Sequence, residues 1–101
     1  MAVESAVTDN GRKLTISVKG RFDFGKHQEF RESYERVDTR PESVIVDLVD
    51  TTYLDSSALG MLLLLRDHAG GDDAHIRVIN SNTDVRKILA ISNFDKLFDI
   101  T

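Results

Sequence analysis

One segment near the middle of this 101-residue chain constrains its fold more than any other. Residues 44–48 are almost entirely apolar and β-branched, which is typical of a strand that is buried on both faces. The block of Met and Leu at residues 61–65 favours a helix. Asp55, Ser56 and Ser57 lie between the two, where the connection leads into the helix. The segment therefore predicts that these polar residues occupy a helix N-terminus near the carboxyl end of a buried strand.

The N-terminal part of the chain predicts an antiparallel hairpin. Residues 3–8 form a weak strand candidate, and apolar and polar residues alternate with a period of two over 14–19. Asp9-Asn10-Gly11 lies between them, and Asn-Gly favours the positive φ angles of a type I′ turn. We therefore expect two strands joined by a tight turn.

Helices and strands alternate in the rest of the chain. The expected elements are a loop at 20–25, a helix at 26–37 that ends before Pro41, the central strand and helix, a strand at 76–79, a helix capped by Ser81 that ends near Asn93, and a strand at 97–100. This order, ββαβαβαβ, predicts a single α/β domain over residues 1–101, with mainly parallel strands joined by right-handed crossovers.

Charge and hydropathy exclude several classes of protein. The net charge is −4 and basic residues form no cluster, which argues against nucleic acid as a partner. The absence of cysteine excludes disulfides and thiol chemistry. The longest apolar block, residues 58–65, is far shorter than the roughly 20 residues that span a bilayer, and no leader peptide is visible. We expect a cytoplasmic domain without direct membrane insertion.

No group of residues predicts catalysis or metal binding. The histidines fall in separate predicted elements, and their spacing matches no compact metal motif. Asp47, Asp50 and Asp55 are acidic, but neither a nucleophile–base pair nor a phosphate-binding glycine loop accompanies them. The sequence therefore predicts a protein that is not an enzyme and has no cofactor or metal.

Three motifs together resemble one known family. They are Gly-Arg-Phe-Asp at 20–23, Val-Asp-Leu at 46–48 followed by Leu-Asp-Ser-Ser-Ala-Leu-Gly at 54–60, and the amphipathic segment 85–94. The chain resembles the STAS domains of anti-sigma-factor antagonists over essentially its whole length. The resemblance implies that Ser56 is phosphorylated by a serine kinase. This sequence departs from the family at Ala58 and Asn93, where glycine is more usual, and the Ala58 methyl is expected beside Ser56.

Helical geometry predicts a docking surface after Ser56. At about 100° per residue, Ala58, Leu62, Leu65 and Ala69 share the face expected to pack on the sheet. The opposite face is expected to be exposed and contains apolar residues, which predicts either contact with the third helix or partner docking. The candidate partner-binding residues are Asp23, Asp55, Ser57, Gly60, Met61 and Leu64.

These polar residues also have simpler interpretations. Ser56 or Ser57 would cap a helix, with Ser57 the better placed of the two, and Asp55 would complement the helix dipole. Asp23 would order its own loop through bonds from its side chain to the backbone.

The resemblance implies a function in transcriptional control by partner switching. The unphosphorylated protein would bind an anti-sigma factor, itself a serine protein kinase, and phosphorylation of Ser56 would release it until a serine phosphatase resets it. One alternative is a STAS accessory subunit of a membrane transporter that binds the transporter's ATPase and is never phosphorylated. A module that binds a small ligand is a third hypothesis.

Overall fold

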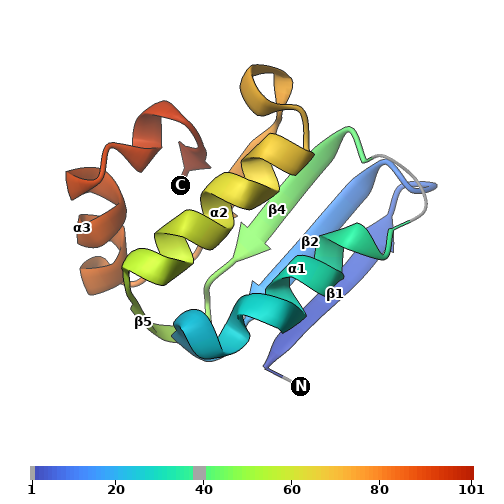
Figure 1. The fold of residues 1–101 in the computed structure, drawn as a ribbon. Helices are drawn as coiled ribbons and strands as arrows, with labels where there is room; N and C mark the ends of the chain where they lie inside the picture. The colour runs from blue at the N-terminus through green and yellow to red at the C-terminus, as the bar shows by residue number, and fades with distance from the viewer. Residues whose placement is uncertain (1, 38–40) are drawn as a thin grey trace.

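The computed structural model describes residues 2–37 and 41–101, and it has the predicted α/β class (Figure 1). The strands and helices, in chain order, are β1 (Val3–Thr8), β2 (Lys13–Val18), β3 (Gly20–Phe22), α1 (His27–Glu35), β4 (Ser43–Asp47), β5 (Thr51–Leu54), α2 (Ser56–His68), β6 (Ile76–Ile79), α3 (Thr83–Ile91) and β7 (Asp99–Ile100). Short 3-10 turns occupy Phe24–Lys26, Gly71–Asp73 and Phe94–Lys96.

The main sheet confirms the predicted hairpin and the predicted parallel pairing. Its five strands lie in the order β1-β2-β4-β6-β7. Strand β1 runs antiparallel to β2, whereas β2–β4, β4–β6 and β6–β7 are parallel pairs. The parallel strands place their carboxyl ends at one edge of the sheet, and the connections that follow them gather there.

The helices α1 and α2 lie on the same face of the main sheet (Figure 1). Val44 and Val46 of β4 point toward this face and are buried, whereas Ser43, Ile45 and Asp47 are only partly buried. The prediction that the central strand is buried on both faces was therefore wrong. Ile45 is also apolar but lies on the opposite, less buried face of the sheet, and this is why the apolar run suggested burial on both faces.

A second, two-stranded sheet is the main feature that the sequence did not predict. Strand β3 pairs in parallel with β5, so residues 20–22 are not part of a loop. The Gly20 amide donates to the Asp50 carbonyl oxygen at 2.9 Å, and the buried Thr51 hydroxyl donates to the Val18 carbonyl oxygen at 2.7 Å. Strands this short show no periodicity, and partners about 30 residues apart cannot be matched by local pattern.

Smaller differences occur at the ends of the elements. The hairpin turn spans residues 9–12 and is longer than the predicted type I′ turn, with positive φ angles at Asp9, Asn10 and Gly11. Strand β7 is two residues long because the amides of Leu97 and Phe98 both donate to the Phe94 carbonyl oxygen, so these two residues belong to a turn and not to the strand. Helix α3 ends near Asn93 as predicted, and Asn93 adopts the left-handed conformation (φ 60°). No helix in the described ranges has the length and hydrophobicity to cross a membrane.

Helix α3 is capped by Asn82 and not by the predicted Ser81. The Asn82 side chain accepts from the Val85 amide at 2.8 Å and donates to the Thr51 carbonyl oxygen at 3.2 Å. The Ser81 hydroxyl is buried and has no hydrogen-bond partner in the part of the chain that the structure describes. Asn82 therefore stabilises the helix and also ties it to β5.

We expect Asn82→Ala to lower the free energy of unfolding by about 1–2 kcal/mol, because it removes both the cap and the bond to β5. Ser81→Ala is the matched control, and it should cost less because it deletes an unpaired hydroxyl. Urea denaturation of both variants measures the difference. A larger loss for Ser81→Ala than for Asn82→Ala would contradict the capping assignment.

Candidate functional site

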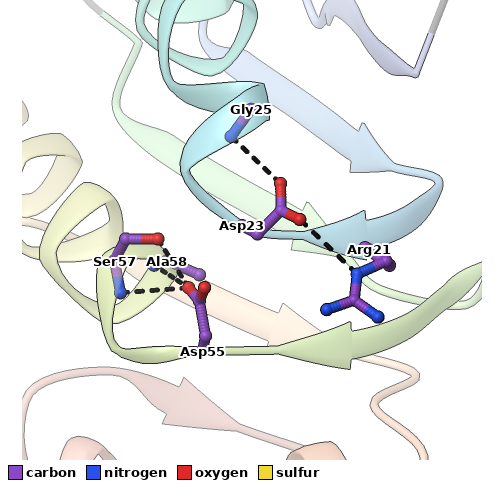
Figure 2. A network of polar contacts seen from close by, with 6 residues as sticks. All are labelled: Arg21, Asp23, Gly25, Asp55, Ser57 and Ala58. Atoms are coloured by element: carbon purple, nitrogen blue, oxygen red, sulfur yellow. Dashed lines mark hydrogen bonds and ion pairs between the residues drawn. The ribbon is translucent and has the colours of Figure 1, made fainter.

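The β3–β5 pair brings together the two acidic residues that the sequence singled out. Phe22 and Leu54 are register partners at the carboxyl ends of these strands, so the next residues, Asp23 and Asp55, emerge side by side. The Asp55 amide donates to the Phe22 carbonyl oxygen at 3.4 Å. Figure 2 shows both carboxylates beside the start of α2. Two segments far apart in the sequence thus build one site.

Asp55 is the N-cap of α2. One of its carboxylate oxygens, Oδ1, accepts from the backbone amides of Ser57 (3.0 Å) and Ala58 (3.1 Å). The same oxygen accepts from the Ser57 hydroxyl (Figure 2). The interpretation of Ser57 as the cap was therefore wrong. Ser57 instead holds the capping carboxylate in place.

These bonds hold the pKa of Asp55 below its ordinary value. The Ser57 hydroxyl is the main cause, the two backbone amides and the positive charge of Arg21 act in the same direction, and burial opposes them. A carboxylate with a lowered pKa contributes stability above its unfolded pKa of about 3.9. That stability is lost as the pH falls through the lower, folded pKa.

We expect Ser57→Ala to raise the pKa of Asp55 toward its ordinary value, because the strongest donor to the carboxylate is removed. The variant should also lose some of the stability that wild type has at neutral pH, and the difference should shrink as the pH falls through the lowered pKa and Asp55 protonates in both proteins. A carbon-13 NMR titration of the Asp55 carboxyl group measures the pKa directly. An unchanged pKa would show that Ser57 does not hold the carboxylate.

Ser56 is the first residue of α2, and it is exposed. Among the residues that the structure describes, none forms a hydrogen bond with its hydroxyl. Asp55 supplies the cap and Ser57 supports Asp55, so Ser56 is left without a structural role. Ala58 is fully buried, so its methyl group lies in the core and not at the surface beside Ser56, where we expected it.

Asp23 orders its own turn, as the simpler interpretation predicted. Its Oδ1 accepts from the Gly25 amide at 3.0 Å, and its Oδ2 lies 3.5 Å from Arg21 Nε (Figure 2). A Cβ at Gly25 would lie only 3.1 Å from Asp23 Oδ1, so the turn favours glycine there. Phe24 lies within this turn with 70% of its surface exposed, and its ring stacks on His27.

The exposed face of α2 differs from the predicted one. Met61 is only 4% exposed and belongs to the core, so its predicted place in a docking surface was wrong. Leu64 is 54% exposed, as expected, and Gly60 is partly buried. Leu63, which the sequence analysis did not select, is 41% exposed. The exposed face therefore includes Leu63 in place of Met61, a small rotation about the helix axis from the predicted face.

Spacing from Ser56 could have found the correct face. Gly60 and Leu63 follow Ser56 by four and seven residues, which places all three on one side of a helix. Phe24 could have been found as the aromatic residue directly after Asp23. We call the following set of residues the Ser56 surface: Asp23, Phe24, Ser56, Gly60, Leu63 and Leu64.

Comparison with known proteins agrees with this fold. The chain is 59% identical, over the full length of both proteins, to a STAS-domain containing protein of Pseudomonas aeruginosa (strain UCBPP-PA14). An anti-sigma factor antagonist from Mycobacterium paratuberculosis has a similar fold (TM-score 0.74, 20% identity, 97% of this chain and 84% of that chain). The anti-sigma factor antagonist SpoIIAA, solved in its unphosphorylated form, is also similar (TM-score 0.71, 14% identity, 99% and 87%).

A family model described as "Mlab, STAS domain" matches residues 5–99, which include every element from β2 to α3 and all residues of the Ser56 surface. The fold, the matched length and the full-length relative agree. This chain belongs to the STAS-domain family.

Proposed function

We propose that this protein is an anti-sigma-factor antagonist that controls transcription by phosphorylation-dependent partner switching. In its unphosphorylated form it binds an anti-sigma factor, itself a serine protein kinase, through the Ser56 surface. Phosphorylation of Ser56 releases the partner, and a serine phosphatase restores the binding form.

One observation carries the proposal: Ser56 is an exposed hydroxyl at a helix start whose cap is supplied by its neighbour. A kinase can modify such a residue without removing a hydrogen bond that the fold needs. The adjacent Ser57 differs, because its hydroxyl is bonded to Asp55 and is partly buried. This difference favours Ser56 over Ser57 as the modified residue.

The surroundings of Ser56 suit a protein partner better than a small ligand. Phe24, Leu63 and Leu64 are large apolar side chains that the fold leaves exposed, Phe24 directly after Asp23 in the chain and the two leucines on the helix that Asp55 caps. Apolar side chains with flanking charges are typical of interfaces, where the apolar groups supply affinity and the charges supply specificity. The structural neighbours, SpoIIAA and the mycobacterial protein, are described as anti-sigma factor antagonists.

A second candidate is a STAS accessory subunit of a membrane transporter. The matching family model is described as "Mlab, STAS domain" and names no anti-sigma factor. Such a subunit would dock on an ATPase through the same surface and would not be phosphorylated. The two candidates therefore differ in the chemical state of Ser56.

The intact mass of the protein purified from its native cell tests the proposal. We expect a fraction that carries one phosphate, that loses it on phosphatase treatment, and whose fragments place it on Ser56. A Ser56→Ala strain is the control and should show no phosphate. An unmodified protein under all growth conditions, recovered together with an ATPase, would favour the accessory subunit instead.

A further inference from the structure

Arg21 is placed next to the phosphorylation site by the pairing of β3 with β5. It is the register partner of Tyr53, three residues before Ser56. Its guanidinium carbon lies 4.5 Å from the centre of the Tyr53 ring, and its Nε lies 3.5 Å from Asp23 Oδ2. Figure 2 shows the Arg21 side chain in the same group of residues as Asp23 and Asp55. The positive charge of Arg21 helps to lower the pKa of Asp55. Arg21 is thus a cation beside two carboxylates.

The contacts that hold Arg21 are weak. Its side chain is 66% exposed, and an exposed ion pair at this distance contributes little to stability. Both of its Nη groups lack a hydrogen-bond partner in the described part of the chain. A long, exposed side chain held only by a single ion pair and a ring contact can reorient toward a stronger anion at small cost.

A phosphate on Ser56 would be that anion. It carries a charge of about −1.5 to −2 at pH 7, against −1 for a carboxylate, and its oxygens match the fork of a guanidinium. The neighbouring Asp23 and Asp55 repel it, and a nearby cation would offset part of that repulsion. We propose that Arg21 pairs with the phosphate of phosphorylated Ser56 and gives up its contact with Asp23 to do so. This inference rests on the proposed modification of Ser56.

The exchange would spread the effect of phosphorylation over the Ser56 surface. Asp23 would lose its counter-ion, and the face of Tyr53 would lose its guanidinium cover. A partner shaped for the unphosphorylated form would then meet altered charge at Asp23 and altered contact at Tyr53, in addition to the phosphate. Arg21 acts in this account as a positioning residue that couples the modification to the docking surface.

A phosphorus-31 NMR titration of the phosphorylated protein tests the pairing. Phosphoserine is incorporated at position 56 during translation, so no kinase is needed. We expect Arg21→Gln to raise the second pKa of the phosphate by about half a unit, because a nearby cation favours the dianion. Arg21→Lys should keep most of the wild-type value, since the charge is retained. The Nε resonance of Arg21 should also shift when wild type carries the phosphate.

Other charged groups close to this end of the molecule supply the controls. Lys26 and His27 follow Asp23 in the chain, and α3, which contacts β5, contributes Asp84, Arg86 and Lys87. Removing the charge of Lys26, Arg86 or Lys87 should change the phosphate pKa less than Arg21→Gln does. An unchanged pKa in Arg21→Gln, or a larger change in one of these controls, would overturn the proposal. Because the phosphate is built in, that result would leave the proposed function standing, whereas absence of phosphate in cells would refute the function alone.

Discussion

Ser56→Asp should fold as wild type does and lose at least about 100-fold in affinity for the anti-sigma factor, which corresponds to about 2.7 kcal/mol. The Ser56 hydroxyl forms no hydrogen bond with the residues that the structure describes, and a helix start accommodates a negative charge through its dipole. The cost falls on the interface, where a carboxylate must give up its water against a surface shaped for a neutral hydroxyl. Isothermal titration against the purified partner measures the affinity.

Ser56→Ala is the matched control, because it removes the acceptor of the phosphate without adding charge. It should bind about as tightly as the unphosphorylated protein and should resist the kinase. Circular dichroism and thermal melting should show the same fold for both variants. Equal affinities for Ser56→Asp and Ser56→Ala would argue against electrostatic exclusion, even if Ser56 is the residue that is phosphorylated.

Met61→Asp and Leu64→Asp should have opposite effects, although the two residues are only three apart. Met61 is 4% exposed and packs in the core, so burying a carboxylate there should cost more than about 3 kcal/mol of unfolding free energy. Leu64 is 54% exposed, and its substitution should stay within about 0.5 kcal/mol. Leu64→Asp should instead weaken partner binding by tenfold or more, since an apolar contact of the proposed interface is lost. Urea denaturation and a binding titration separate the two effects.

Three further variants serve as controls, two for folding at position 61 and one for binding. Met61→Leu keeps the volume and should cost less than about 1.5 kcal/mol, whereas Met61→Ala should cost about 2–5 kcal/mol. Ile91→Asp is the surface control for binding, because Ile91 is 81% exposed and lies on α3, outside the Ser56 surface. If Leu64→Asp destabilised the protein as much as Met61→Asp, Leu64 would have to be assigned to the core.

The sequence predicted the elements that carry a long periodic pattern. The alternation at Leu14, Ile16 and Val18 gave the right strand with the right buried face, and the apolar block at 61–65 lies in α2 as expected. The sequence could not predict β3 and β5, because these strands are stabilised by pairing with each other and neither has a periodic pattern of its own. The choice among adjacent polar residues for the caps of α2 and α3 also depends on backbone geometry that composition does not reveal.

The sequence predicted the positions of the polar candidate residues in the fold more accurately than the exposed face of α2. The resemblance to the family selected Asp23, Asp55 and Ser56. Asp23 and Asp55 are 32 positions apart in the chain, and the β3–β5 pairing explains why they lie close together. The docking face was misplaced because four consecutive leucines, residues 62–65, and a methionine make every side of α2 apolar. Hydrophobicity alone therefore could not identify which side faces the sheet. The sheet selects Ala58, Met61, Leu62 and Leu65.

The central claim is that the chemical state of one hydroxyl decides whether the partner is bound. The most direct measurement compares two samples of the same chain, with serine or with phosphoserine at position 56, by titration against the anti-sigma factor. We predict tight binding for the serine form, a loss of at least about 100-fold for the phosphoserine form, and full recovery after phosphatase treatment. Equal affinity of the two forms for the partner would contradict the account.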